Sequence, residues 1–318
     1  MRIGIDAMGG DFAPFEIVKG SVQASALLPS GVTIVLVGDQ PQIEEILKKE
    51  NYSGNNIEIV HAPEVITMSD HPAKAFQQKM QSSIVVGFGM LAKGKIDSFA
   101  SAGNTGAMMV GAMFVIKAIE GVIRPVISGP VSRINSDIPT TLLDVGLNAD
   151  CKPEVLYQYG ILGSIYAKCV WGIENPKVAL LNIGSEAEKG NILTKATFEL
   201  MKDSKDFTFI GNVEGNDLLI DKSDVVVCDG FTGNIVLKLI ESLYSVNVKR
   251  AKNDEYFNKF NYENEGGTPV LGINAPVLIG HGVSNANAIK NLVLTSKRIV
   301  ETNLVEKIKQ RFSNNDSN

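Results

Sequence analysis

The sequence predicts one continuous α/β domain with a largely parallel sheet, extending over residues 1–318. Short runs of apolar, β-branched residues of strand length alternate along the chain with longer segments of helical periodicity. Most of these runs end in a loop rich in glycine, asparagine, threonine or aspartate, after which the helical segment begins. The sequence contains no internal repeat and no linker of biased composition, so nothing in it divides the chain into separate domains.

The first half of the chain repeats a strand–loop–helix pattern. Residues 2–7 are expected to form a strand, and Pro14 stands at the start of a predicted helix that ends near residue 28. After a second strand at 33–37, Asp39 is placed to cap the next helix. The remaining predicted elements of this half are strands at 57–60 and 98–101 and helices at 72–93 and 107–119.

The second half continues this pattern around one irregular segment and one exposed segment. Residues 124–136 contain two prolines, and only residues 126–128 within them have strand character. Residues 247–267 are charged, aromatic and rich in asparagine, which is typical of an exposed excursion. The predicted strands are 140–145, 178–183, 207–210, 225–227 and 277–279, and the predicted helices are 153–171, 191–201, a segment starting at 235, and 285–312.

The stretch VVVCDGFTGNIVLK at 225–238 is the one around which we expect the fold to be organised. Its three valines suit a strand buried on both faces, and the turn at 229–234 leads into a helix. Two glycines let the backbone of this turn approach a ligand closely, and Thr232 and Asn234 can cap the helix or bind an anion. Free N–H groups at such a helix start favour phosphate.

Four predicted strand ends open into loops of this composition. They are residues 6–11, 101–106, 182–191 and 229–234. Each could be an ordinary tight turn, which is the commoner use of glycine and asparagine together. Because loops at one end of a parallel sheet converge, their recurrence predicts a single electropositive cleft that holds an inorganic anion.

Composition excludes several classes of function. A net charge of −5 argues against a general nucleic-acid binder. The three cysteines lack metal-ligand or disulfide spacing, and no secretory segment precedes the first strand, so we expect a cytosolic protein without disulfides or structural zinc. The longest apolar run, 107–116, is well short of the roughly 20 residues that span a bilayer, so any membrane contact is peripheral.

Several catalytic and cofactor motifs are absent from the sequence. Neither the dinucleotide fingerprint GxGxxG after the first strand nor the phosphate-binding loop GxxxxGK[ST] occurs. The nucleophile elbow GxSxG and the catalytic cysteine motifs are also missing, which leaves covalent catalysis without an obvious nucleophile.

A few charged side chains are candidates for chemistry. Lys189 neutralises a bound phosphate if it faces the cleft, whereas a solvated lysine is the ordinary alternative. His281 lies in a glycine-flanked loop after a strand, where it can donate a hydrogen bond or a proton, or serve a structural role. Asp6, Asp11 and Asp229 can organise N–H groups and lysines, or simply cap turns.

The predicted C-terminal helix is strongly basic. Its basic residues are Lys290, Lys297, Arg298, Lys307, Lys309 and Arg311, against only Glu301 and Glu306. A charged helix face is usually just solvated, but this one could dock an acidic carrier protein.

Seven motifs together resemble the bacterial phosphate acyltransferase family (PlsX) over nearly the whole chain. They are IDAMGGD at 5–11, SAGNTGA at 101–107, LLDVG at 142–146, GIENPKVALLNIG at 172–184, KGN at 189–191, GNVEG at 211–215 and VVVCDGFTGNIVLK at 225–238. The resemblance implies a homodimer with a three-layer α/β/α fold like that of the isocitrate and isopropylmalate dehydrogenases. It also implies transfer of a fatty acyl group from acyl-acyl carrier protein to inorganic phosphate. The acyl phosphate would pass to a membrane glycerol-3-phosphate acyltransferase for phospholipid synthesis.

The residues fit the chemistry that the resemblance implies. Phosphate is expected to be held by backbone N–H groups of the turns 104–106 and 232–234, with Lys189 as counter-charge, and to attack the thioester directly. His281 would protonate the departing thiolate or bind the oxyanion. The expected catalytic residues are Lys189, His281 and Asn234, and the expected phosphate- or substrate-binding residues are Asp6, Gly9, Gly10, Asp11, Asn104, Thr105, Gly106, Asn182, Gly184, Asn191, Asp229, Thr232 and Gly233. No metal or redox cofactor is expected.

Two other functions stay open at this point. One is a phosphotransacylase that uses acyl-CoA, and the other is a non-catalytic regulatory dimer that binds an anionic metabolite. A nicotinamide-linked dehydrogenase of the same fold is disfavoured by the missing fingerprint. The segment 247–267 is shorter and more polar than the helical excursion usual in the family, although its aromatic residues Tyr256, Phe257 and Phe260 are placed to touch a membrane surface.

Overall fold

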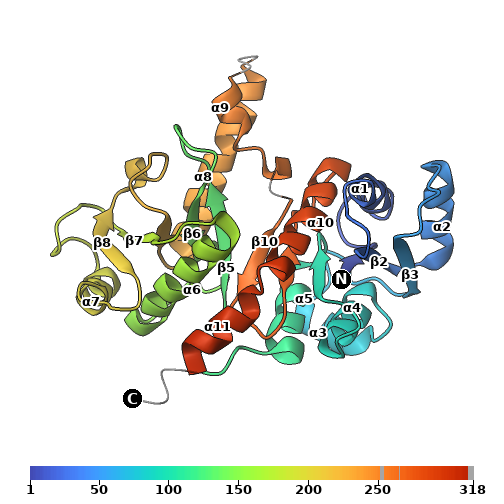
Figure 1. Cartoon of the computed structure of the whole chain (residues 1–318), viewed down its shortest axis with the longest axis horizontal. Helices are drawn as coiled ribbons and strands as arrows, with labels where there is room; N and C mark the ends of the chain where they lie inside the picture. Colours follow the sequence, from blue (N-terminus) through green and yellow to red (C-terminus); the bar gives the residue numbers. More distant parts are fainter. Residues whose placement is uncertain (251–253, 265, 314–318) are drawn as a thin grey trace. The chain divides into compact units, whose positions relative to one another are not determined.

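The computed structural model describes residues 1–250, 254–264 and 266–313, and its contacts divide the chain into two compact units. Unit 1 comprises Met1–Ala118 and Tyr262–Glu301, and unit 2 comprises Ile119–Asn261 and Thr302–Asn318. Each unit has its own strands and helices (Figure 1). That the whole chain forms one domain stays a prediction.

The sheet of unit 1 is parallel except at one edge. Its strands lie in the order β3-β2-β1-β4-β11-β10, and only β10 and β11 pair antiparallel. The strands are β1 (Arg2–Asp6), β2 (Thr33–Gly38), β3 (Ile57–His61), β4 (Ser98–Ser101), β10 (Thr268–Leu271) and β11 (Val277–Ile279).

Helices cover both faces of this sheet. Every residue of β4 and all but the first residue of β2 are buried, and successive side chains of a strand point to opposite faces. Helices α1 and α10 pack side by side, as Figure 1 shows. The helices of unit 1 are α1 (Phe15–Ser25), α2 (Gln40–Lys49), α3 (Pro72–Gln78), α4 (Ser83–Ala92), α5 (Thr105–Val110) with its π-helical continuation (Gly111–Ile116), a short 3₁₀ turn (Tyr262–Asn264) and α10 (Ala286–Glu301).

Unit 2 repeats the plan with fewer strands. Its order is β5-β6-β9-β7-β8, parallel except for the antiparallel pair β5 and β6. The strands are β5 (Val126–Val131), β6 (Thr140–Leu143), β7 (Lys177–Leu181), β8 (Thr208–Val213) and β9 (Val225–Val227). The helices are α6 (Pro153–Trp171), α7 (Ile192–Met201), a 3₁₀ turn (Gly215–Asp217), α8 (Gly230–Lys249), α9 (Glu255–Asn258) and α11 (Leu304–Ser313).

The core of unit 2 forms where α6 crosses the middle of the sheet. The three valines of β9 are fully buried, as their β-branched run predicts. Gly163 of α6 lets the helix approach closely, since a Cβ there would lie 2.3 Å from Leu143 Cδ1 and 2.5 Å from Val225 Cγ1. The same sheet therefore supports β9 and the turn that follows it.

The predicted α/β class with a largely parallel sheet is confirmed. Two predicted helices are nevertheless interrupted. The segment 72–93 forms α3 and α4, because Ser82 accepts the N–H of Val85 and starts a new helix. The segment 285–312 forms α10 and α11, with Asn303 between them at a left-handed φ of 52°. The sequence prediction also missed β10, the antiparallel edge strand.

The predicted exposed excursion at 247–267 is only partly exposed. Asn247 and Phe260 are buried, and the ring of Phe260 meets that of Tyr256 edge-on at 5.0 Å. Phe257 packs against the same two rings, so the aromatic side chains proposed to touch a membrane contact one another. Within the described ranges, no helix combines the length and the apolar character needed to cross a bilayer.

Candidate active site

The residues predicted to form the site lie at the carboxyl ends of strands in both units. Unit 1 holds Asp6, Gly9, Gly10, Asp11, Asn104, Thr105, Gly106 and His281. Unit 2 holds Asn182, Gly184, Lys189, Asn191, Asp229, Thr232, Gly233 and Asn234. Each group comes together within its own unit, and a single cleft shared by all four loops stays a prediction.

In unit 1, Asp6 joins the loops that follow β1 and β4. Its carboxylate is buried at the end of β1 and accepts hydrogen bonds from the Ser101 hydroxyl at 2.6 Å and from the Met8 N–H at 3.0 Å. Gly9 is required beside it, because a Cβ there would lie 2.3 Å from Asp6 Oδ2 and 2.7 Å from the Gly103 nitrogen. Asp6 thus holds the two loops together by hydrogen bonds, and its carboxylate is buried away from solvent.

Burial raises the pKa of the Asp6 carboxyl above its ordinary value. Hydrogen bonds from the hydroxyls of Ser101 and Ser83 and from the N–H groups of Met8 and Gly9 favour the charged form and oppose this rise. Desolvation is the larger effect. The carboxyl therefore holds its proton more tightly in the folded protein than in water.

The loop that carries His281 lies against the loop after β1. The Asp11 N–H donates to the Gly282 carbonyl at 2.7 Å, and the Ser284 N–H donates to the His281 carbonyl at 3.0 Å. Gly10 has a φ of 111°, a conformation that favours glycine, and a Cβ there would approach the Gly282 carbonyl oxygen to 3.1 Å. His281 is half-buried and the Asp11 side chain is exposed.

Asn104 is used to build the start of α5. Its Oδ1 caps the helix by accepting the Ala107 N–H at 2.9 Å, and its Nδ2 donates to the carbonyls of Thr67 at 2.9 Å and Asp70 at 3.2 Å. Both donors of the side-chain amide are therefore engaged within the protein, and the amide has no N–H left for an anion. Gly106 packs on Pro72, and the N–H groups of Thr105 and Gly106 find no acceptor within the described part of the chain.

In unit 2, the start of α8 is closed by its own cap. Asp229 accepts the Thr232 N–H at 2.8 Å and the Thr232 hydroxyl at 2.9 Å, while its backbone carbonyl accepts the Gly233 N–H at 3.0 Å. The Gly230 N–H donates to the Asn148 carbonyl at 2.8 Å. A phosphate at this turn would have to share the N–H groups of Thr232 and Gly233, whereas the Phe231 N–H has no acceptor among the described residues.

Asp144, which the sequence analysis did not single out, holds the loop whose Asn148 carbonyl accepts the Gly230 N–H of this turn. Its buried carboxylate accepts the N–H groups of Gly146, Leu147 and Asn148 and the side-chain amide of Asn148, at 2.7–3.0 Å. The available signal was the motif LLDVG, where an aspartate and a glycine follow a strand.

Two residues of the α8 turn fit against this loop. Asn234 Nδ2 donates to the Val145 carbonyl at 3.0 Å, so its amide positions the loop after β6. Gly233 lies so close that a Cβ there would be 1.9 Å from the Asp144 carbonyl oxygen. Asn234 therefore helps to position the loop after β6, and its catalytic role stays a prediction.

The loop after β7 is held by hydrogen bonds between the side-chain amides of Asn182 and Asn191 and backbone groups. Asn182 accepts the Ile183 N–H at 2.9 Å and donates to the Lys189 carbonyl at 3.2 Å. Asn191 caps α7 as predicted, accepting the Thr194 N–H at 2.8 Å. Gly184 lies against the stem of Lys189, where a Cβ would be 2.9 Å from Lys189 Cγ. The Lys189 side chain is exposed, and its ammonium has no partner among the residues that the structure describes.

A pocket of about 340 Å³ lies between these two helix starts. The strands β7 and β9 are parallel neighbours, and the pocket is formed beyond their carboxyl ends, where open α/β sheets bind ligands. Its lining residues are Leu156 of α6, Leu181, Asn182 and Ile183 after β7, Gly190, Asn191 and Thr194 at the start of α7, and Cys228, Asp229 and Thr232 at the start of α8.

The lining is apolar and amide-rich, and it is not electropositive. Leu156, Leu181, Ile183 and Cys228 supply apolar surface, and the charged lining residue is the carboxylate of Asp229. Burial, together with the carboxylates of Asp229 and Asp144, raises the pKa of the Cys228 thiol well above its ordinary value, so the thiol is neutral. The arrangement suits an uncharged chain with amide or carbonyl groups better than a free anion.

Among the described residues, no three histidine, cysteine or carboxylate side chains are placed to share a metal ion.

Comparison with known proteins identifies the family. The model of a family described as fatty acid synthesis protein matches residues 1–307. A phosphate acyltransferase of Acetivibrio thermocellus is 44% identical, with 99% of this chain and 97% of the relative covered. A phosphate acyltransferase of Dictyoglomus turgidum is 42% identical, with 97% and 96% covered.

Solved structures with the same fold include two phosphotransacetylases. The enzyme of Streptococcus pyogenes has a TM-score of 0.66 at 17% identity, covering 95% of this chain and 94% of its own. The EutD phosphotransacetylase of Staphylococcus aureus has a TM-score of 0.64 at 16% identity, covering 94% of each chain. At such identities the likeness concerns the fold alone. The sequence matches carry the assignment: the chain belongs to the fatty acid synthesis protein family, the family of the phosphate acyltransferases, and its prediction as an enzyme of the transferase class is confirmed.

Proposed function

We propose that the protein transfers a fatty acyl group from acyl-acyl carrier protein to inorganic phosphate, giving acyl phosphate for phospholipid synthesis. The shared name of its relatives, phosphate acyltransferase, supports transfer to phosphate. The description of the family as fatty acid synthesis protein supports a fatty acyl group. The carrier protein as donor rests on the resemblance of the motifs.

The pocket beyond β7 and β9 is the observation that carries this proposal. Ile183, which is 80% exposed, is the most accessible of its apolar side chains and can contact an alkyl chain, and burial of each methylene contributes about 0.8 kcal/mol. Asn182, Asn191 and Thr194 add polar atoms that can bond a carbonyl or an amide. These groups fit the thioester end of an acylated carrier.

Lys189 is the charge that we assign to phosphate. It precedes Gly190, which lines the pocket, and its carbonyl is bonded by Asn182, which lines the pocket as well. Its exposed ammonium has no carboxylate partner among the described residues. A phosphate bound by this ammonium would lie at the loop that carries Gly190 into the pocket lining.

The proposed reaction is a direct displacement. A phosphate oxygen attacks the thioester carbonyl carbon, a carbon–oxygen bond forms, and the carbon–sulfur bond breaks. The carrier leaves as a thiolate and takes up a proton to become the free thiol. A neutral Cys228 is a poor nucleophile, which favours this path over an acyl-enzyme. The protonation role of His281 and the phosphate-binding roles of the unit 1 residues stay predictions.

Mass spectrometry of the products tests the proposed function. The full chain is incubated with acyl carrier protein bearing a fatty acyl group, with and without phosphate, and in parallel with the matching acyl-CoA. We expect acyl phosphate from the carrier only when phosphate is present. Acyl phosphate formed from acyl-CoA but not from the carrier would overturn the assignment of acyl carrier protein as the donor. Phosphate binding without any turnover would support the regulatory dimer instead.

We also propose a homodimer, a cytoplasmic location with any membrane contact peripheral, and delivery of acyl phosphate to a membrane glycerol-3-phosphate acyltransferase. An exposed apolar stripe on α8 supports the dimer, since Phe231, Ile235 and Leu239 recur at four-residue spacing and are 64%, 53% and 66% exposed.

A further inference from the structure

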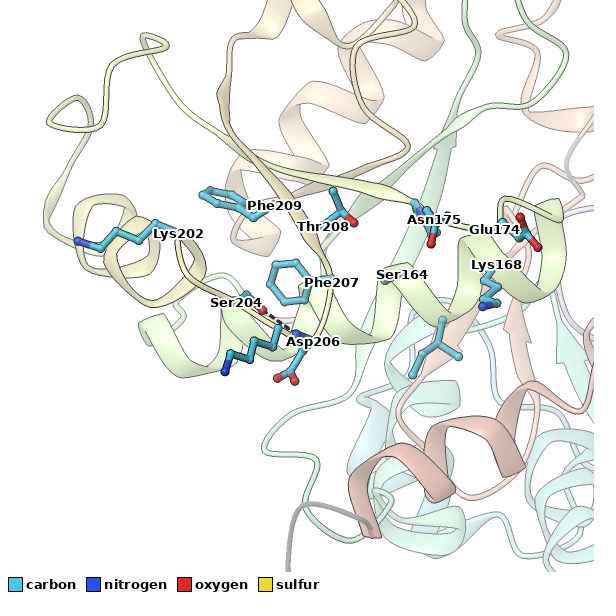
Figure 2. A pocket seen from close by; sticks show the side chains of 13 residues that line it. Ser164, Lys168, Glu174, Asn175, Lys202, Ser204, Asp206, Phe207, Thr208 and Phe209 are labelled. Atoms are coloured by element: carbon cyan, nitrogen blue, oxygen red, sulfur yellow. Dashed lines mark hydrogen bonds between the residues drawn. The ribbon is translucent and has the colours of Figure 1, made fainter. Parts of the chain in front are cut away.

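Unit 2 contains a second hollow, which the proposed acyl transfer does not use. It is a cavity of about 620 Å³, formed by α6, the segment before β7, the end of α7 and the start of β8 (Figure 2). It lies at the amino ends of β7 and β8, whereas the candidate active site lies beyond the carboxyl ends of β7 and β9. The two hollows are therefore at opposite ends of β7.

Several hydrogen-bond donors that line the cavity have no partner among the described residues. The ammonium groups of Lys168 and Lys205 and the side chains of Ser164, Asn175 and Thr208 all line it. Within the described part of the chain, none of these five side chains makes a hydrogen bond or an ion pair. Figure 2 shows that Ser164 and Lys168 come from α6, while Asn175 comes from the segment before β7. Oxygen atoms of a ligand would satisfy these donors.

The free charges of the lining favour an anion. Asp206 is engaged by Arg311 and by the Tyr157 hydroxyl, and the ammonium of Lys202 is engaged by Glu199. Glu174 is the lining carboxylate that keeps no partner among the described residues. Two unpaired ammonium groups thus stand against one unpaired carboxylate, and charge-assisted bonds from lysine to phosphate are roughly twice as strong as neutral ones.

One wall of the cavity is apolar. Ile165, Phe207 and Phe209 line it, and the two rings are held by aromatic neighbours. Phe207 packs on Tyr157 with ring centroids 5.3 Å apart, and Phe209 meets Phe198 edge-on at 5.4 Å. Phe207 is itself buried, whereas Ile165 and Phe209 are half-buried, so these two side chains offer the accessible apolar surface to a flat or apolar part of a ligand. The volume falls within the range of pockets for small molecules, about 300–1,000 Å³.

We propose that this cavity binds a phosphorylated small molecule with a ring-shaped or other apolar part, of the size of a nucleoside diphosphate. Lys168 and Lys205 neutralise its phosphate groups, and the hydroxyls of Ser164 and Thr208 and the amide of Asn175 bond its oxygens. The ring lies against the half-buried side chains of Phe209 and Ile165.

Titration calorimetry of the full chain with adenosine 5′-diphosphate tests the proposal, with adenosine as the uncharged comparison. We expect saturable binding of the diphosphate and at least about tenfold weaker binding of adenosine. Lys168→Glu and Lys205→Glu should each weaken binding of the diphosphate about tenfold or more. Lys93→Glu is the matched control, because Lys93 is an exposed lysine at the end of α4 in unit 1 and undergoes the same change of charge.

Three outcomes would overturn the proposal: no saturable binding of the diphosphate, adenosine binding as tightly as the diphosphate, or equal affinity in the cavity variants and in Lys93→Glu. Both cavity lysines are exposed, so thermal unfolding of the variants should match that of the unmodified chain. The measurement needs no turnover, and its failure is therefore separate from a failure of the proposed acyl transfer.

Discussion

Lys189 carries the positive charge that the proposed reaction needs. Removing an ammonium that binds phosphate should weaken the binding of phosphate. The fold should stay intact, because the side chain is exposed. We expect Lys189→Ala to raise the apparent KM for phosphate about tenfold. Lys195→Ala is the control, an exposed lysine of α7 that does not line the pocket. An unchanged phosphate dependence would remove Lys189 from the site.

Asp6 should make stability depend on pH. Its pKa is raised in the folded protein, so the folded state binds the proton more tightly than the unfolded chain does. Stability from this group is therefore greatest below the ordinary pKa of 3.8 and falls as the pH rises from there through the raised pKa. Asp6→Asn has no such proton, so the advantage of the unmodified chain over this variant should shrink as the pH rises.

Urea unfolding of both proteins at a series of pH values above 4 measures this difference. Other titrating groups are shared by the two proteins and cancel. A constant difference in unfolding free energy across the series would show that Asp6 is ionised throughout.

Local chemistry could be predicted from the sequence, whereas distant partners could not. Asp39 and Asn191 each precede a helix, and both cap it as predicted. The binding of phosphate by backbone N–H groups of the turn at 104–106 stays a prediction, whereas the side-chain amide of Asn104 bonds the carbonyls of Thr67 and Asp70, more than thirty residues away in the chain, which the sequence could not show. Asp144 accepts N–H groups of the loop after β6, and this depends on a loop conformation that could not be predicted from the motif alone.

At the scale of elements, the contact between α8 and the loop after β6 leaves no room for a side chain. A Cβ at Gly233 would lie 1.9 Å from a backbone oxygen, which cannot rotate away. Gly233→Ala should therefore destabilise the protein by about 2–3 kcal/mol and displace the helix start that lines the pocket. Gly215→Ala is the control, since no atom lies within 4 Å of a Cβ there.

Urea unfolding and activity are measured for both glycine variants. We expect Gly233→Ala to lose activity under conditions in which it is still folded, because Thr232 and Asp229 belong to the same helix start. Equal stability of the two variants would mean that the backbone at Asp144 moves aside for the added methyl group without loss of stability.

The exposed stripe of α8 is the element that we assign to the dimer contact. A glutamate within an apolar interface is strongly disfavoured, because its charge would be buried without a partner. Leu239→Glu should convert the dimer to a monomer in analytical ultracentrifugation. Leu27→Glu is the matched control, since Leu27 is 61% exposed and Leu239 is 66% exposed. A dimer that survives Leu239→Glu, or a monomeric unmodified chain, would contradict the assignment.

Helix boundaries were predictable where the chain marks them. Helix α6 matches its predicted range because Pro153 starts it and Gly172 ends it in a left-handed conformation, with φ of 72°. The break between α10 and α11 has neither proline nor glycine, and Asn303 adopts the left-handed conformation instead. The strand β10 was missed although Gly272 and Pro276 mark the loop between it and β11, because Thr268–Leu271 has only four residues and contains Pro269, which is unusual within a strand.

At the scale of the whole molecule, the chain passes between the units three times, after Ala118, Asn261 and Glu301. Unit 1 is incomplete without the late segment, since β11 pairs with β4 and α10 packs on α1. Unit 2 likewise uses the last helix, because Arg311 of α11 pairs with Asp206. Neither unit is a continuous piece of chain, so each depends on segments whose ends are held by the other.

This connectivity predicts that both units unfold in one transition. Trp171, the single tryptophan of the chain, ends α6 in unit 2, so its fluorescence reports that unit, whereas far-ultraviolet circular dichroism reports the helices of both. In urea the two signals should have the same midpoint and the same slope, as a single cooperative domain requires. A fluorescence midpoint distinct from the dichroism midpoint would show that unit 2 unfolds independently of unit 1, and the prediction of one domain over residues 1–318 would then be wrong.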